Sequence, residues 1–246
     1  MKLLEVQDLC KTYPGFKLEG ISFSVESGSI MGFIGRNGAG KTTTLKSLLH
    51  IVHPESGSIR FFGMDFAQHE GEIKQRIGFA GGAVDFYKRK PIRVLAEVTG
   101  GFYENWDKAA YRRWMDAFSL DENKTPMQLS EGMRVKLSLT LALSHHAELL
   151  ILDEPTSGLD PVSREELLEA FRFLRDKGVS ILFSTHITSD LEKCADQISY
   201  ISKGRLIASE PMQGFLERCA AEGMGTNLDE IMVHQEKESL YDKVIE

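Results

Sequence analysis

Residues 149–160 read LLILDEPTSGLD, and four consecutive apolar residues in this stretch precede two acids. The apolar residues do not alternate with polar ones, which predicts a strand buried on both faces, as in a parallel sheet. Asp153 and Glu154 then place charge at the end of this strand, where unpaired charge is costly. Two interpretations fit these acids. They form a surface turn or helix cap, which Pro155 supports, or they form a metal and water site at the mouth of a parallel sheet.

Composition narrows the class of protein. The 246 residues include 29 Lys and Arg against 36 Asp and Glu, for a formal charge of −7. Nucleic acid and anionic membranes attract clustered positive charge, so we expect no nucleic-acid partner. There is no apolar run of membrane-spanning length, and the charged start MKLLEVQDLCKTY is unlike a signal peptide. With three widely spaced cysteines, we expect a soluble, intracellular chain with reduced thiols.

The first half of the chain changes from strand-like to helical patterns. Ile21, Phe23 and Val25 alternate with polar residues, which predicts a half-buried antiparallel strand. A buried strand at residues 30–34 precedes a glycine-rich loop and a helix, and another strand follows near residue 60. From about residue 84 to residue 145 apolar residues recur at helical spacing.

The second half returns to alternating strands and helices. Ser163 and Glu166 have the spacing of a capping box, and Gly178 ends the helix that follows. The strand VSILFST comes next, and QISYISKGRLIASE predicts a hairpin that turns at Lys203 and Gly204. We expect an α/β chain with a main domain over residues 1–215, including the helical insertion at about 84–145, and a helical, charged tail over residues 216–246.

The stretch GRNGAGKT fits the phosphate-loop pattern G-x-x-x-x-G-K-T and lies between a predicted strand and a predicted helix, as that motif requires. Its glycines let backbone N–H groups surround phosphate oxygens at a helix N-terminus. Lys41 would contact the β- and γ-phosphates, and the Thr42 hydroxyl would coordinate Mg²⁺. The alternative is a glycine turn that happens to precede Lys and Thr, and the correct flanks favour nucleotide binding. The predicted nucleotide contacts are Gly35, Arg36, Asn37, Gly38, Ala39, Gly40, Lys41, Thr42 and Thr43.

A phosphate loop also suggests a role for the two acids Asp153 and Glu154. An acidic strand end can hold Mg²⁺ and orient or deprotonate water, with Asp153 on the metal through water and Glu154 beside the attacking water. Both motifs follow strands, and open α/β sheets bind ligands at the carboxyl ends of their strands. Helix capping remains a secondary role for Asp160, which precedes Pro161 at a possible first helical position.

Three further stretches carry a resemblance to a known family. LSEGM lies before the acidic strand, PTSGLD follows it, and ILFSTHITSD ends another buried strand on His186. In order and spacing the chain resembles an ATP-binding cassette (ABC) ATPase over about residues 3 to 215. The resemblance implies a P-loop NTPase, RecA-like core with an N-terminal antiparallel β subdomain and an inserted helical subdomain.

The resemblance also implies roles for single residues. Ser130 and Gly132 of the signature would contact the γ-phosphate bound by the opposite subunit of a head-to-tail dimer. Asp160 would lie at the dimer seam, His186 would be the switch histidine, and Tyr13 would stack on adenine. Simpler alternatives exist for each side chain: Ser130 as a helix cap, His186 as a strand-end histidine and Tyr13 as packing.

The sequence departs from the family pattern in two places. The family has a glutamine between the phosphate loop and the helical insertion, whereas this chain has Gly82 near that place, and Asp85 is a hypothetical substitute for its metal or water contact. Glu131 and Met133 replace a glycine and a glutamine of the signature. These differences affect the expected coupling between hydrolysis and partner movement more than they affect ATP binding.

Aromatic residues crowd the helical insertion and are interpreted either as packing or as a groove for a partner's helix. They are Phe102, Tyr103, Trp106, Tyr111 and Trp114. The insertion and the acidic strand resemble separate-chain ATPases of bacterial exporters for antimicrobial peptides and drugs.

We therefore expect an ATP- and Mg²⁺-dependent ATPase with Glu154, His186 and Lys41 as its catalytic residues. It would power a separate integral membrane permease from the cytoplasmic face of the membrane, together with a second ABC ATPase domain in a homodimer or heterodimer. The alternative is a soluble ABC ATPase that assembles or remodels proteins, as in iron–sulfur assembly. The remaining histidines, including His50, His53, His145 and His146, lack acidic or cysteine partners at metal-ligand spacing and are expected to be structural or on the surface.

Overall fold

A computed structural model describes residues 1–81 and 87–235 of the chain, and it contains two stacked sheets. The six-stranded sheet has the order β10-β9-β3-β8-β7-β6, and the four-stranded sheet has the order β2-β1-β4-β5. The strands are β1 (Lys2–Tyr13), β2 (Phe16–Glu26), β3 (Ile30–Ile34), β4 (Ser56–Phe61), β5 (Met64–Asp65), β6 (Ile77–Gly81), β7 (Leu149–Asp153), β8 (Ser180–Thr185), β9 (Gln197–Ser202) and β10 (Arg205–Pro211).

The six-stranded sheet is parallel except at β10, which pairs antiparallel with β9. Its central strands are buried on both faces, as the unbroken apolar runs predict. In β7, Leu150 and Leu152 pack in one core, while Leu149 and Ile151 pack in another. The smaller sheet is antiparallel, and Ile21 and Val25 of β2 are buried as their alternation predicts.

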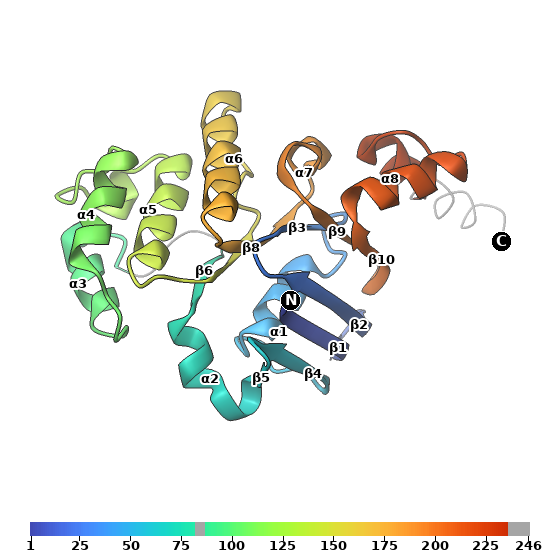
Figure 1. Cartoon of the computed structure of the whole chain (residues 1–246), viewed down its shortest axis with the longest axis horizontal. Coiled ribbons are helices and arrows are strands. Elements are labelled where there is room, and N and C mark those ends of the chain that lie inside the picture. Colours follow the sequence, from blue (N-terminus) through green and yellow to red (C-terminus); the bar gives the residue numbers. More distant parts are fainter. Residues whose placement is uncertain (82–86, 236–246) are drawn as a thin grey trace.

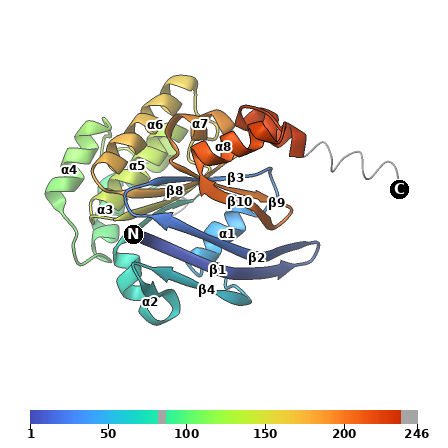
Figure 2. The same ribbon diagram turned by 45° about the vertical axis from the view of Figure 1, so that its right-hand side comes forward.

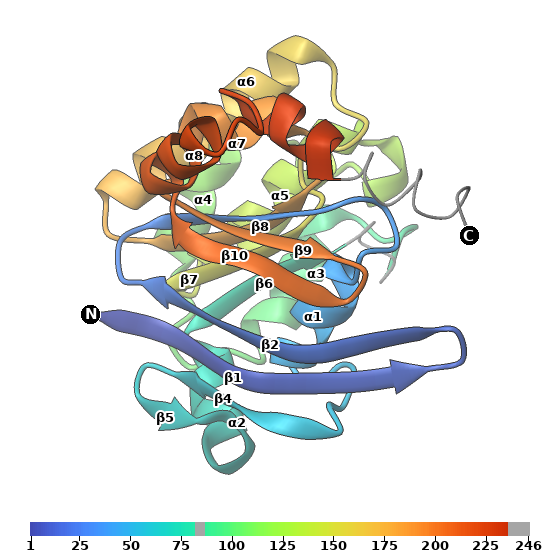
Figure 3. The same ribbon diagram turned by 90° about the vertical axis from the view of Figure 1, so that its right-hand side faces the viewer.

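Helices cover one face of the six-stranded sheet, and the antiparallel sheet lies across the other (Figures 2 and 3). The helix α1 (Lys41–Leu48) lies between the two sheets, and α2 (Phe66–Gln75) lies beyond the antiparallel sheet. The covering helices are α5 (Glu131–Leu143), α6 (Pro161–Asp176), α7 (Thr188–Cys194) and α8 (Met212–Ala221). Within residues 1–81 and 87–235, no helix has the length and apolar character needed to cross a membrane.

The helical insertion forms a separate lobe at the end of the sheet marked by β6 (Figure 1). It contains α3 (Ile92–Gly100), α4 (Lys108–Ala117), the 3₁₀ helix η1 (Pro126–Gln128) and α5, around a core of its own that includes Leu95, Met115 and Leu137. Gly82 and Asp85, at the place of the family's glutamine, lie outside the described residues.

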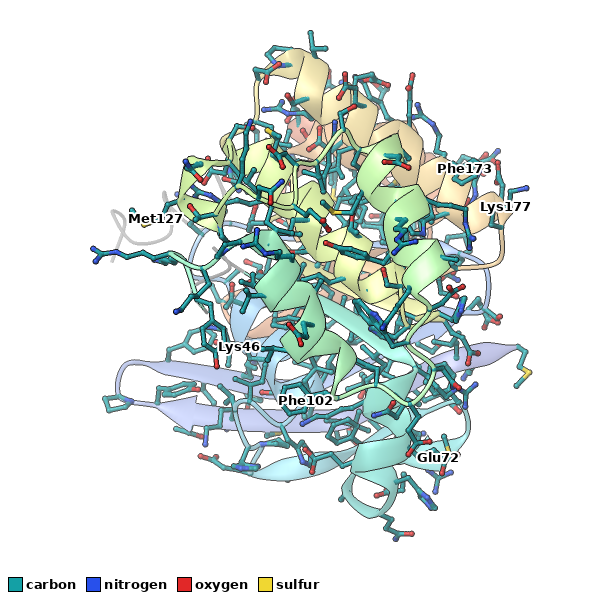
Figure 4. The ribbon with its side chains drawn as sticks, turned by 90° about the vertical axis from the view of Figure 1, so that its left-hand side faces the viewer. Lys46, Glu72, Phe102, Met127, Phe173 and Lys177 are labelled. Atoms are coloured by element: carbon teal, nitrogen blue, oxygen red, sulfur yellow. The ribbon has the colours of Figure 1, made fainter. Side chains whose placement is uncertain are left out.

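The aromatic segment of the lobe mostly packs within the protein. Tyr111 is buried, Trp114 stacks on Phe118, and the ring of Tyr103 stacks on His145 at a centroid distance of 3.6 Å. Phe102 is the exception, because it is 73% exposed. Figure 4 shows Phe102 and the exposed Met127 well apart on this side of the molecule.

The C-terminal part continues the main core. The β9–β10 hairpin turns at Lys203 and Gly204, both with positive φ, as the sequence predicts. The expected division between residues 215 and 216 falls inside α8. Residues 228–235 are also helical, and residues from both sides of the division share one hydrophobic core with residues of α6 and α7. The core residues contributed by α8 and by residues 228–235 are Met212, Phe215, Cys219, Leu228 and Ile231.

One predicted helix start is wrong. The spacing of Ser163 and Glu166 predicts a capping box, but α6 begins at Pro161 with Asp160 as its N-cap. The Asp160 carboxylate accepts hydrogen bonds from the backbone N–H groups of Val162 and Ser163 and from the Ser163 hydroxyl. An acid directly before a proline therefore caps the helix better than the serine three residues later.

Candidate nucleotide-binding site

A loop of residues 35–40 joins the buried strand β3 to the N-terminus of α1. Gly40 has a φ of 114°, and a side chain there would lie 2.9 Å from the ring of Phe16, so glycine is required at this turn. The loop is tied to the β9–β10 hairpin, because the Gly204 N–H donates to the Ala39 carbonyl at 3.0 Å. The loop therefore directs its backbone toward the start of α1, where anions bind favourably.

A cavity of about 640 Å³ opens over this loop. Its lining joins the phosphate loop with the ends of β7 and β8, as the sequence predicts, and Gly35 and Ala39 belong to the loop without lining the cavity. The lining also includes three residues that the sequence reasoning missed: Gly15, Phe16 and Ser157. The predicted residues that line it are Arg36, Asn37, Gly38, Gly40, Lys41, Thr42, Thr43, Glu154 and His186.

Lys41 is the buried cation of the site, with a side chain only 5% exposed. Its ammonium donates to the carbonyl oxygens of Gly35 and Arg36 at 2.7 and 3.3 Å. It also forms an ion pair with Glu154, with Nζ 3.1 Å from Oε1. The loop carbonyls and the acid thus hold the charge at the start of α1, within reach of a phosphate in the cavity.

Asp153 lies against the first turn of α1. Its Oδ1 accepts hydrogen bonds from the Thr42 hydroxyl at 3.0 Å and from the Ser184 hydroxyl at 2.6 Å. A hydroxyl and a carboxylate at this separation supply the hard oxygen donors that Mg²⁺ prefers. The sequence pattern did not predict a role for Ser184. This residue lies on β8, the strand next to β7, directly opposite Asp153.

Glu154 adopts a left-handed backbone conformation with a φ of 51°, which is uncommon outside glycine and typical of functional sites. Its N–H donates to the Ser184 hydroxyl at 2.9 Å, which holds this turn. Its Oε2 lies 2.8 Å from Nδ1 of His186, while its Oε1 faces Lys41. A partly exposed carboxylate between a cation and an imidazole is suited to orient water and to accept a proton.

Tyr13 does not line the cavity. It ends β1 and pairs with Phe16 across the β1–β2 turn, and the residue is 38% exposed. Lys11 lies over this ring, with Nζ 5.6 Å from the centroid. Phe16, rather than Tyr13, contributes to the cavity wall.

The signature residues lie on another surface. Ser130 caps α5 by accepting a hydrogen bond from the Met133 N–H at 3.3 Å, as its helix-cap interpretation predicts. A side chain at Gly132 would lie 3.5 Å from Leu159 and Ser163, so the N-terminal ends of α5 and α6 are close together. Neither Ser130, Gly132 nor Asp160 lines the cavity. Hydrogen bonds from Ser163 lower the pKa of Asp160, which therefore stays charged as a helix cap.

The other histidines lie apart from this site. His145 is buried beneath Tyr103, and burial lowers its pKa to about 4, so the ring is neutral near pH 7. In the described part of the chain, no group of three or more His, Cys, Asp or Glu residues is arranged to hold a metal ion. The three cysteines, Cys10, Cys194 and Cys219, are free thiols.

The fold and the cavity define a P-loop ATPase of the ABC class, and comparison with known proteins confirms this. The family model "ABC transporter" matches residues 18–157, so the chain belongs to the ATP-binding, ATP-hydrolysing subunits of ABC transporters. The bacitracin transport ATP-binding protein BcrA of Bacillus licheniformis is 34% identical over 224 residues, which cover 88% of this chain and 72% of BcrA. YtrB of Bacillus subtilis, an ABC transporter ATP-binding protein, is 31% identical over 206 residues, or 83% of this chain and 70% of YtrB.

A solved structure shows the same fold. The ATP-binding subunit of an ABC transporter superposes with a TM-score of 0.83 at 29% identity and covers 94% of this chain and 98% of its own. The predicted α/β class, with a P-loop core, an antiparallel β subdomain and a helical insertion, is therefore confirmed.

Proposed function

We propose that this ATPase powers the export of peptides or drugs through a separate integral membrane permease, from the cytoplasmic face of the membrane. The similarity to the bacitracin transport ATP-binding protein BcrA supports this assignment. So does the similarity to the probable multidrug ABC transporter ATP-binding protein YbhF of Escherichia coli, 32% identical over 213 residues that cover 84% of this chain and 37% of YbhF. These relatives favour transport over the alternative of protein assembly. The exposed Phe102 of the helical lobe supplies an apolar contact of the kind that a partner helix uses.

The observation that carries the proposed chemistry is the chain of contacts from Lys41 through Glu154 to His186. Lys41 and the loop N–H groups bind the β- and γ-phosphates of ATP. Incoming phosphate competes with Glu154 for Lys41, which releases the carboxylate to orient and deprotonate the attacking water. His186 then fixes this carboxylate from the other side.

The residues beside the loop fit Mg²⁺. When bound, Mg²⁺ would neutralise charge on the β- and γ-phosphates, held by the Thr42 hydroxyl and, through water, by Asp153. Ser184 orients Asp153 by a hydrogen bond of 2.6 Å. Phe16 lines the cavity and would stack on the adenine, and Tyr13, its cross-strand neighbour, would lie beside it.

A second ABC ATPase domain would complete the site. Ser130 and Gly132 do not line this chain's own cavity and would reach the γ-phosphate bound by the opposite domain. Asp160, which caps α6, would lie at the seam. The proposal includes a homodimer or a heterodimer with another ABC ATPase.

Glu154→Gln tests the proposed chemistry. The purified variant should bind ATP at least as tightly as the unaltered chain, because a neutral amide competes less strongly for Lys41 than a carboxylate does and does not repel phosphate. Its turnover should fall by roughly 100-fold or more, since general-base catalysis contributes about 10²–10⁴-fold. Phosphate release measures turnover, and full turnover in this variant would assign the base elsewhere.

Co-purification tests the transporter assignment. The tagged chain, isolated from gently solubilised native membranes, should bring down a multi-spanning membrane protein in equal amount, identified by mass spectrometry. Recovery of soluble partners alone, with the chain absent from the membrane fraction, would support the assembly alternative instead.

A further inference from the structure

The first turn of α7 begins two residues after His186 and determines where that side chain can lie. The N-cap residue is Ile187, whose side chain cannot cap the helix by a hydrogen bond. Its backbone N–H donates to the Thr185 hydroxyl at 2.9 Å. His186 therefore stands on a short connection between β8 and Thr188, the first residue of α7. Whatever fixes Thr188 also limits the movement of the His186 ring.

The C-terminal helical segment, residues 228–235, fixes this turn. The buried hydroxyl of Thr188 donates to Asp229 Oδ1 at 2.5 Å, although 41 residues separate the two in the chain. One residue earlier, the Leu228 N–H donates to Glu192 Oε1 at 2.7 Å. Leu228 and Ile231 are each 1% exposed and share a core with Leu191 of α7. The segment thus contacts α7 by two hydrogen bonds and by apolar packing.

Among the described residues, no other side chain of the first turn forms a hydrogen bond to the C-terminal segment, although Leu191 packs in the same core. Thr188 is 7% exposed, so its hydroxyl needs a protein partner. Asp190 is 1% exposed, but neither of its carboxylate oxygens has a hydrogen-bond partner among the described residues. Ser189 is exposed. Loss of Asp229 would remove the hydrogen-bond partner of the buried Thr188 side chain, so this end of α7 would be held only by the packing of Leu191 and by the bond to Glu192.

We propose that Asp229, acting through Thr188, is a positioning residue that holds the His186 ring against Glu154. The C-terminal segment, which lies beyond the matched family region, thereby becomes part of the machinery for hydrolysis. This inference rests on the proposed role of His186 in that reaction.

Thr188→Val tests the inference, because it removes the hydroxyl and keeps the shape of the side chain. It should lower kcat about tenfold and leave KM for ATP within about twofold, since a misplacement of 1 Å in a catalytic group can cost about a hundredfold. Thr188→Ser keeps the hydroxyl and should retain the original kcat. Asp229→Ala, at an exposed position, should reproduce the loss even where the valine variant folds poorly.

A double-mutant cycle separates positioning from general destabilisation. In a His186→Ala background, Thr188→Val should change kcat by less than about twofold. An equal loss in both backgrounds, or no loss in the original one, would overturn the inference. If the unaltered chain does not hydrolyse ATP, the proposed function fails. In that case the position of the His186 ring is measured by its ring ¹H chemical shift. Thr188→Val should change this chemical shift and Thr188→Ser should not, and an unchanged shift in Thr188→Val would overturn the inference.

Discussion

Gly204→Ala should disturb both the fold and the nucleotide site, because this glycine joins three segments of the chain. Its N–H donates to Ala39 of the phosphate loop at 3.0 Å, and its carbonyl accepts from the Glu19 N–H at 2.9 Å. The residue has a φ of 76°, and an added Cβ would overlap the carbonyl oxygen of Lys17. Since this obstacle is backbone, no change of rotamer can relieve it.

The expected magnitude follows from these contacts. The left-handed conformation costs an alanine roughly 1 kcal/mol, and the weakening of two hydrogen bonds costs about 1 kcal/mol each. The free energy of unfolding should therefore fall by about 3 kcal/mol, which lowers the melting temperature by roughly 6–12 °C for a chain of this size. ATP affinity should also fall, because the Ala39 carbonyl loses its anchor.

Gly178→Ala is the matched control. Gly178 has a φ of 89°, and no atom lies within 4 Å of an added Cβ, so only the conformational cost of about 1 kcal/mol applies. Urea unfolding should separate the two variants by about 2 kcal/mol, and ATP titration should show weaker binding for Gly204→Ala alone. Equal stability and equal ATP affinity in the two variants would refute the importance of the contact with Lys17.

Two further substitutions test single side chains of the site and of the α6 cap. Lys41→Ala should abolish the thermal stabilisation by ATP and Mg²⁺, which should reach about 2.7 kcal/mol at 100 times Kd in the unaltered chain; an unchanged affinity in a direct titration would contradict the phosphate-loop assignment. Asp160→Asn should lower stability at neutral pH, because the lowered pKa of Asp160 means that its charged form stabilises the fold. The difference should persist above the ordinary value of 3.8 and disappear as the pH falls through the lowered pKa, and urea unfolding at a series of pH values measures it.

Local patterns predict the strands and the phosphate loop well, because their causes lie within a few residues. The unbroken apolar run before Asp153 reflects burial on both faces, and the glycines of residues 35–40 reflect a turn that only they can adopt. The start of α6 was harder to predict, since Asp160 and Ser163 both suit a cap and only their geometry decides between them.

Contacts between distant segments are the part that local patterns miss. Ser184 supports Asp153 from a neighbouring strand, and Phe16 replaces Tyr13 at the cavity wall because of the hairpin register. The hydrogen bond from Thr188 to Asp229 likewise joins residues that are far apart in the sequence. None of these pairs has a signature in spacing, because each depends on how elements pack after they form.

The strand order has a consequence for how the protein is made. β8 lies between β3 and β7, so the strand that separates the phosphate loop from its acids is synthesised after both of them. A growing chain that has completed Asp153 and Glu154 still lacks Ser184, which orients one acid and holds the turn of the other. Nucleotide binding should therefore begin late in synthesis, after β8 has paired with β3 on one side and with β7 on the other. Bound nucleotide would then stabilise those chains in which β8 has taken its place in the sheet.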